Sequence, residues 1–148
     1  MPTIRSATLA DIPAMLLIEQ SANSHPWSEG TFHTCFSERY FNAVLLEDND
    51  TITGFYIGEK VAVEASLFNI GVAPTAQGRG YGQQLLQHFI ARAQELEALD
   101  CWLEVRQSNS KAIKLYEKCG FIQTGVRPNY YPTTAGREDA ILMALPLG

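Results

Sequence analysis

The chain has 148 residues, of which 46% are hydrophobic and 18% charged, a composition typical of a globular protein with one buried core. Its net charge of −5 argues against broad binding to the phosphate backbone of nucleic acids, which requires clustered lysine and arginine. The three cysteines, Cys35, Cys101 and Cys119, are far apart and form no disulfide or zinc pattern. The histidines do not cluster either, so we expect no metal site.

The N-terminus carries no recognisable targeting pattern. It lacks the charged-then-apolar order of a signal peptide, and the apolar run at residues 14–18 is too short to span a bilayer. We therefore expect a single domain over residues 1–148, located in the cytoplasm with its thiols reduced.

Strand-like and helix-like segments alternate in the first half of the chain. Thr8 and Asp11 have the spacing of a capping box, and Trp27 and Phe32 flank Ser28 as a hydrophobic staple would. These signals predict a strand over residues 3–7, helices over residues 12–22 and from Ser28, and strands over residues 42–47, 52–59 and about 61–72.

The second half begins with the longest predicted helix. Its apolar residues share one face, and they are Tyr81, Leu85, Leu86, Phe89, Ile90, Ala93 and Leu96. We further predict a buried strand over residues 101–105, a helix from its cap Asn109 to Lys118, and closing strands over residues 121–127 and 139–145 joined by a loop at 128–137. This order predicts an α/β mixed sheet with helices on both faces, and one strand–helix–strand crossover within residues 61–105.

The most informative segment is the glycine-rich bend at residues 77–82, which reads Gln-Gly-Arg-Gly-Tyr-Gly. Its glycines remove side chains just before a helix begins, so backbone N–H groups and the helix dipole can bind an anion such as a pyrophosphate. No Gly-Lys-Ser/Thr follows, which excludes a P-loop, and Gln83 replaces the third glycine of a dinucleotide fingerprint. Alone, the bend could also be a tight turn that needs positive φ.

The surroundings of this bend resemble the Gcn5-related N-acetyltransferase (GNAT) superfamily. An apolar strand precedes the bend, a strand carrying Glu104 follows the helix, and a capped helix carrying Tyr116 ends at residues 118–121. The resemblance covers nearly the whole chain. It implies the acyltransferase fold of that superfamily, whose central mixed sheet splays between two parallel strands, and acetyl-CoA as co-substrate without a metal.

Within the superfamily, the chain looks like the N-terminal acetyltransferases. Residues 127–132 read Arg-x-Asn-Tyr-Tyr-Pro, and residues 136–140 read Gly-Arg-Glu-Asp-Ala. Residues 102–106 and 109–116 match as well. The nearest resemblance is to the bacterial enzymes that acetylate the N-terminal alanine of the eighteenth protein of the small ribosomal subunit. This implies that protein's N-terminus as partner, with no direct contact to nucleic acid or membrane.

The resemblance also implies a cofactor site. Backbone N–H groups at residues 78–83 would bind the diphosphate, and the amide arm would pair with a free strand edge at residues 70–72. Arg79 could add a charge-assisted contact, although an arginine in such a loop is equally often only solvated. The full expected set is Ile70, Gly71, Val72, Gln77, Gly78, Arg79, Gly80, Tyr81, Gly82, Gln83 and Asn109.

Four side chains carry the expected chemistry and selectivity. By resemblance, Glu104 is the general base, directly or through water, and Tyr116 protonates the leaving thiolate. From spacing alone, Glu104 could equally be a solvated carboxylate and Tyr116 a core aromatic. Tyr130 and Tyr131 would wall the peptide entrance, although a rigid surface turn is the simpler interpretation.

Three other functions remain open on the sequence. The same fold could acetylate another protein N-terminus, a small-molecule amine or an antibiotic, or it could sense acyl-CoA without turnover. A dinucleotide-binding oxidoreductase is disfavoured by the missing third glycine and by the lack of an evident ribose-binding acid.

Overall fold

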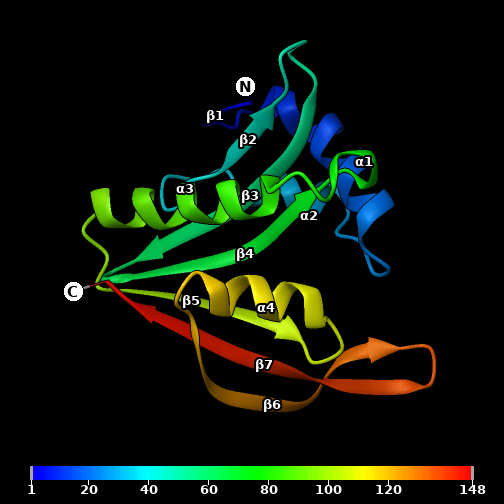
Figure 1. Cartoon of the computed structure of the whole chain (residues 1–148), viewed down its shortest axis with the longest axis vertical. Helices are drawn as coiled ribbons and strands as arrows, with labels where there is room; N and C mark the ends of the chain where they lie inside the picture. The colour runs from blue at the N-terminus through cyan, green and yellow to red at the C-terminus, as the bar shows by residue number, and fades with distance from the viewer. Residues whose placement is uncertain (1, 148) are drawn as a thin grey trace.

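A computed structural model describes residues 2–147, in which seven strands form one mixed sheet (Figure 1). The strands are β1 (Thr3–Ser6), β2 (Ala43–Leu46), β3 (Ile52–Val61), β4 (Glu64–Val72), β5 (Asp100–Arg106), β6 (Ile122–Thr133) and β7 (Gly136–Pro146). Their order across the sheet is β1-β2-β3-β4-β5-β7-β6, and every neighbouring pair is antiparallel except β4 and β5, which are parallel. The predicted mixed sheet is therefore confirmed.

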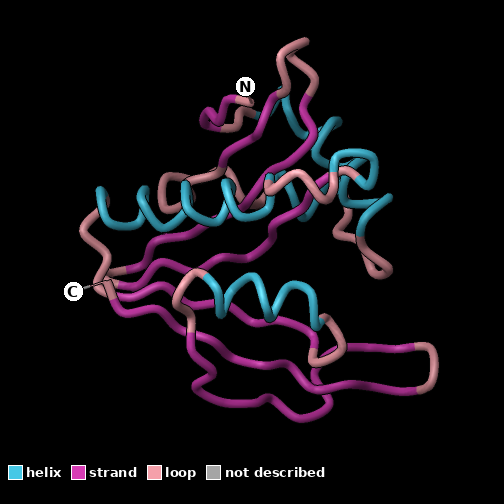
Figure 2. The backbone as a smooth tube through the Cα atoms, viewed as in Figure 1, coloured by secondary structure: helices cyan, strands magenta, loops and turns pink. Residues whose placement is uncertain are grey.

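Helices cover both faces of this sheet (Figure 2). They are α1 (Ile12–Ala22), α2 (Glu29–His33), α3 (Tyr81–Glu95) and α4 (Ser110–Lys118), with single 3-10 turns η1 (Leu9–Asp11) and η2 (Pro74–Ala76). On one face α3 buries Leu85 and Phe89 in the larger of two apolar clusters. On the other face, α1 and α2 bury Met15 and Phe32 against the Phe55 side of β3.

The helix-start signals of the sequence are also confirmed. The Asp11 carboxylate accepts hydrogen bonds from the Thr8 N–H at 2.8 Å and from its hydroxyl at 3.2 Å. Ser28 caps α2 by accepting from the Thr31 N–H, and the rings of Trp27 and Phe32 lie 5.3 Å apart, as expected for a hydrophobic staple. None of the helices within residues 2–147 has the length and apolar character that a bilayer crossing would need.

The two parallel strands separate before they end. Their pairing runs only from Glu64 opposite Asp100 to Leu67 opposite Leu103. The next residue, Phe68, is passed over in the β3–β4 register, and such a β-bulge bends its strand. Beyond the bulge, the end of β4 pairs with β3 alone while β5 pairs with β7 alone, so the gap leaves a free edge on β4 at residues 70–72.

Two predicted boundaries are wrong. Val61 belongs to β3, because the chain reverses at Ala62 with φ of 54°, and β4 begins only at Glu64. The predicted loop at 128–137 is mostly strand, since β6 and β7 continue as a hairpin to Thr133 and Gly136. Tyrosine and threonine favour strands, and β6 is an edge strand, where proline is tolerated.

Candidate active site

A continuous groove crosses the molecule where β4 and β5 separate. It consists of three adjoining cavities of about 500, 630 and 520 Å³. The first lies against the glycine bend and α4, and shares Gly71, Asn109 and Tyr116 with the second. The second and third share Glu104 and Tyr131. The groove therefore joins the possible anion site to the aromatic segment of β6.

The glycine bend forms the outer end of the first cavity. Gly78 and Gly80 have φ of 82° and 81°, and a Cβ added to either would meet no heavy atom within 4 Å. Glycine is therefore required at these two positions by the positive φ and not by crowding from neighbouring atoms. No hydrogen bond to a described residue is recorded for the amides of residues 78–83, and the first is donated by Gln84 to the Gly80 carbonyl at 3.1 Å. Open N–H groups at the start of a fifteen-residue helix suit a bound phosphate group.

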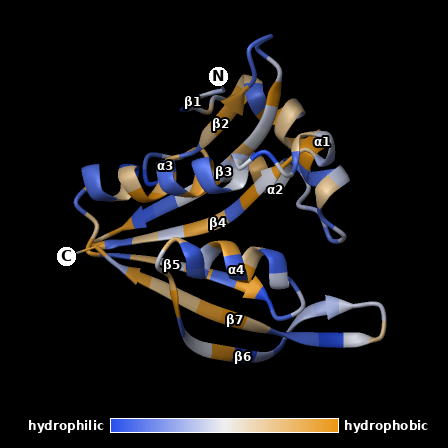
Figure 3. Cartoon of the chain, in the orientation of Figure 1, coloured by the Kyte–Doolittle hydropathy of each residue, from blue (hydrophilic) through white to orange (hydrophobic). Residues whose placement is uncertain are grey.

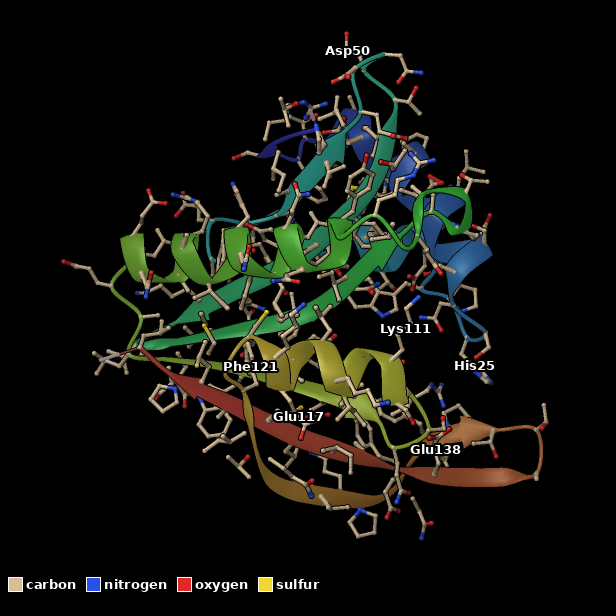
Figure 4. All side chains as sticks on the ribbon, viewed as in Figure 1. His25, Asp50, Lys111, Glu117, Phe121 and Glu138 are labelled. Atoms are coloured by element: carbon tan, nitrogen blue, oxygen red, sulfur yellow. The ribbon has the colours of Figure 1, made fainter. Side chains whose placement is uncertain are left out.

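All residues of the predicted cofactor set line this cavity except Arg79. Arg79 instead pairs with Glu47 at 2.7 Å, and the Tyr81 hydroxyl donates to the same carboxylate at 3.1 Å. In this structure a carboxylate of the turn that follows β2 pairs with Arg79, and the phosphate contact of Arg79 stays a prediction. Lys111 lines the cavity in its place, from the first turn of α4 (Figure 4).

Lys111 was missed in the sequence analysis although a signal existed. It lies two residues after the cap Asn109, whose side chain accepts from the Ala112 N–H at 3.2 Å. A cation in the first turn opposes the helix dipole, which is unfavourable unless an anion is bound nearby.

The free edge of β4 forms the floor between the first and second cavities. A Cβ at Gly71 would lie 2.9 Å from the Phe55 ring, so glycine is required here because the Phe55 side chain leaves no room for a larger residue. The Val72 carbonyl accepts from the Gln77 side chain at 3.2 Å, which ties the strand to the bend. An amide-containing arm can lie along such an edge as an added strand would.

Tyr116 lies where the first and second cavities meet. It is 6% exposed, and its ring packs edge-on against Phe121 with centroids 6.0 Å apart. Burial raises the pKa of Tyr116, and the nearby Tyr131 raises it further. Among residues 2–147 no hydrogen-bond partner is recorded for its hydroxyl, so a protonated phenol faces the groove at neutral pH.

Glu104 faces the second and third cavities from the middle of β5. Its neighbours Leu103 and Val105 point into the core, and the Glu104 side chain keeps 29% of its surface exposed. One carboxylate oxygen lies 3.0 Å from Arg127 of β6. Glu104 is thus a groove-lining carboxylate held by one arginine, with its second oxygen open to an amine or a water.

Tyr130 and Tyr131 form the wall of the third cavity, from strand β6 rather than from a loop. Their rings meet edge-to-face at 5.0 Å, with Arg127 over Tyr130 at 5.2 Å and Arg106 over Tyr131 at 4.6 Å. Burial and the Glu104 charge raise the pKa of Tyr131 to about 12. The irregular pairing between Arg127 and Tyr131 sets the direction of both rings.

The hairpin is fastened to the loop that carries Asn109. The Glu138 carboxylate accepts from the Ser108 N–H at 2.9 Å and from its hydroxyl at 3.1 Å, and these hydrogen bonds hold the pKa of Glu138 below its usual value. Arg106 donates to the Pro132 carbonyl at 2.8 Å. Glu138 lies where the hairpin passes α4 (Figure 4). Along the chain, β7 changes from hydrophilic to hydrophobic (Figure 3).

Sequence reasoning missed the wall formed by the α1–α2 connection. Glu19, Asn23, His25 and Trp27 line the second cavity opposite β5, and Trp27 also lines the third. These residues lie about eighty positions from Glu104 and match no local motif. Within residues 2–147 no group of three or more His, Cys, Asp or Glu side chains could hold a metal ion.

Known proteins resemble this chain over its whole length. The chain is 49% identical over 147 residues to the [ribosomal protein bS18]-alanine N-acetyltransferase of Escherichia coli strain K12, covering 99% of both chains. It is 45% identical to the protein of the same name from Haemophilus influenzae, covering 97% of this chain and 98% of the other. The crystal structure of the Escherichia coli ribosomal-protein-S18-alanine N-acetyltransferase superposes with a TM-score of 0.96 at 48% identity, covering 100% of this chain and 95% of that one.

The family model for the acetyltransferase (GNAT) family matches residues 12–121. This span includes the splayed strands, the glycine bend, Glu104 and Tyr116, which are the features from which the groove is built. The chain belongs to the acetyltransferase (GNAT) family.

Proposed function

We propose that this protein is an N-α-acetyltransferase that transfers the acetyl group of acetyl-CoA to the N-terminal alanine of ribosomal protein bS18. The observation that carries the proposal is one groove that links open backbone amides, Tyr116, Glu104 and a tyrosine wall in that order. Full-length relatives at 45–49% identity bear the name of this activity, which supports the same substrate here.

The residues of the first cavity fit acetyl-CoA. Amides of residues 78–83 would hold the diphosphate, with Lys111 adding a positive charge, and the β4 edge would hold the amide arm. When bound, acetyl-CoA supplies an acetyl group activated as a thioester. A backbone N–H at the β4 edge would polarise the acetyl carbonyl as a single oxyanion donor.

Glu104 and Tyr116 would handle the two protons of the reaction. The substrate ammonium must lose a proton before it can attack, and the open oxygen of Glu104 can accept it directly or through a water. The Tyr116 hydroxyl keeps its proton at neutral pH and can donate it to the leaving thiolate. The two groups line a shared cavity, so the base and the acid can take part in the same reaction.

An α-amine suits this arrangement better than a lysine side chain. Its pKa of about 7.7–8.0 leaves roughly a tenth of it neutral at pH 7, against fewer than about one in a thousand lysines at pKa about 10.4. Tyr130 and Tyr131 would pack against the first residues of the peptide. A ribosomal substrate would also be consistent with a location in the cytoplasm. The continuous sheet supports one catalytic domain over the chain.

The test is an acetylation assay with the purified protein and acetyl-CoA, read by mass spectrometry. We expect one added acetyl group on the α-amine of a peptide that copies the bS18 N-terminus. We expect little transfer to the same peptide with a blocked α-amine and a free lysine, or to a polyamine. Preferred transfer to the polyamine would contradict the proposal, and coenzyme binding without any transfer would indicate a sensor.

A further inference from the structure

Two carboxylates of the described chain are buried, and they differ in their partners. Asp11 is 6% exposed and forms an ion pair with Arg5 at 2.8 Å. Glu19 of α1 is 2% exposed, and no cation within residues 2–147 lies in ion-pair range of it. Burying a carboxylate without a cation is unfavourable unless other groups stabilise it. Glu19 therefore lacks a counter-charge that a ligand could supply.

Among the residues that the structure describes, hydrogen-bond donors reach one of the two Glu19 oxygens. Oε2 accepts from the Trp27 N–H at 2.9 Å and from the Asn23 side chain at 3.3 Å. These bonds hold the α1–α2 connection in place as a wall of the second cavity. No donor among the described residues is recorded for Oε1. One oxygen of a fixed carboxylate that lines the cavity is therefore available to a ligand.

A second polar group of the same cavity also lacks a partner. The side-chain Nδ2 of Asn69, on β4 just beyond the bulge, is buried and has no hydrogen-bond acceptor within residues 2–147. Unsatisfied buried donors are rare in folded proteins and call for an explanation such as a bound group. The second cavity is thus lined by the Glu19 carboxylate, which lacks a cation, and by the Asn69 side-chain amide, which lacks an acceptor.

The N-terminus of a peptide carries the two groups that would satisfy Glu19 and Asn69. A peptide N-terminus begins with a charged ammonium, and the first carbonyl group lies two backbone atoms further along. Glu104 and Tyr116 line the same cavity, so a substrate amine must enter it to react. The groups that bind the amine before reaction need not be those that deprotonate it.

We propose that Glu19 and Asn69 form the subsite for the first residue of the substrate, with Glu19 accepting a hydrogen bond from the α-ammonium and Asn69 donating one to the first carbonyl. This inference rests on the proposed function. It assigns Glu19 to recognition of charge and leaves proton removal to Glu104. It also explains why the buried Glu19 carboxylate has no cationic partner among the described residues, because the substrate ammonium supplies that charge.

The test compares Glu19→Gln with wild type in the full chain. Glutamine keeps an oxygen for the Trp27 N–H, so the wall is retained, while the charge is lost. The probes are a peptide of alanine followed by uncharged residues, and an analogue with a hydrogen atom in place of the α-amine, which has nothing to donate to Glu19. With coenzyme A present, we expect Glu19→Gln to weaken binding of the amine peptide by roughly 10-fold or more, as for a lost charged hydrogen bond, and to leave binding of the analogue without the amine unchanged. The KM for acetyl-CoA should not move.

Asn69→Ala gives a different signature under this proposal. Both probes contain the first carbonyl, so we expect both to weaken by a similar factor. The control is Glu29→Gln on α2, whose side chain is 63% exposed and lines none of the three cavities, and which should behave as wild type.

Equal weakening of both probes by Glu19→Gln would show that Glu19 only supports the wall and would overturn the inference, as would no effect at all. If Glu19→Gln does not fold by circular dichroism, a crystal structure of wild type with coenzyme A and the amine peptide decides. We expect the peptide nitrogen within hydrogen-bond distance of Glu19, and a nitrogen remote from it overturns the inference. A wild-type protein that acetylates no alanine peptide would instead refute the proposed function.

Discussion

Tyr116 is the residue whose environment is best suited to proton donation. Its ring is held against Phe121, and its hydroxyl has no hydrogen-bond partner within residues 2–147. Burial raises the pKa of Tyr116, so the hydroxyl stays protonated. A leaving thiolate released into the same pocket is desolvated too, so its basicity rises along with that of the phenolate. The proton transfer therefore stays feasible although the phenol is a weaker acid than in water.

Replacing Tyr116 by phenylalanine removes the hydroxyl and keeps the ring contacts. We expect turnover to fall by roughly 10²-fold or more, the usual size for a lost general acid, with the Kd for coenzyme A nearly unchanged. Steady-state kinetics and calorimetry measure the two quantities separately. Unchanged turnover would remove Tyr116 from the mechanism.

The role of Glu104 as general base can be tested by how the activity lost in Glu104→Gln depends on pH. We expect Glu104→Gln to reduce kcat most at low pH, because the fraction of neutral amine falls as the pH drops below the α-amine pKa of about 8 and the base is then needed most. A pH–rate profile of variant and wild type measures this. The same fold loss at every pH would indicate that Glu104 only positions the substrate.

The direction of Glu104 was predictable from the sequence, but its partner was not. Alternation along β5 places Glu104 opposite to Leu103 and Val105, as the structure confirms. Arg127 approaches it from a different strand, and Arg79 turns to Glu47 thirty-two positions away. Such pairs depend on sheet order and side-chain rotamers, which no local pattern specifies.

Among the structural elements, the start of α3 allows binding to be separated from stability. Gly82 has ordinary helical geometry, and a Cβ there would lie 3.4 Å from Leu115, a normal contact. Alanine favours the helix interior by about 0.5–1 kcal/mol over glycine. The protein itself therefore gives no reason for glycine here, whereas a ligand close to the backbone would.

We expect Gly82→Ala to retain or raise the free energy of unfolding while increasing the Kd for coenzyme A by roughly 10-fold, since about 1.4 kcal/mol of lost contact gives that factor. Gly30→Ala is the matched control, because Gly30 is also helical and its Cβ would meet only Ser28 at 3.8 Å. Chemical denaturation and calorimetry provide the data. Unaltered coenzyme affinity in Gly82→Ala would mean that the ligand does not approach this turn.

Most elements followed from sequence patterns, and the exceptions have physical causes. Capping residues and helical spacing located α1, α3 and α4 because those signals are local. The hairpin of β6 and β7 was taken for a loop, since tyrosine, proline and glycine are common in both. Only the pairing of Tyr131 with Glu138 and its neighbours makes that segment a strand, and pairing is a tertiary property.

Across the sheet as a whole, the β4–β5 gap divides the strands into two groups. The strands β1 to β4 and the strands β5 to β7 share only the short parallel pairing that ends at Leu67 and Leu103. A ligand lying in the gap contacts both groups and would stabilise them together. The splay was expected from family resemblance alone, because periodicity along each strand carries no information on where two strands part.

Coenzyme A should therefore raise the thermal stability of the protein. At a concentration 100 times its Kd, a ligand of the native state adds about 2.7 kcal/mol. For a chain of this size, that corresponds to a rise in Tm of roughly 5–11 °C, at about 2–4 °C per kcal/mol. Differential scanning calorimetry measures the shift, and adenosine diphosphate at the same concentration as coenzyme A should give a smaller one, because it lacks the amide arm and binds more weakly. Equal shifts for both ligands would place the arm outside the gap.

The position of coenzyme A in a crystal structure of its complex with this protein bears most directly on the proposed mechanism. We predict the diphosphate against the amides of residues 78–83, the amide arm along residues 70–72 of β4, and the sulfur beside Tyr116. A gap closed by side chains, or a coenzyme bound elsewhere on the surface, would contradict the proposed acetyl transfer.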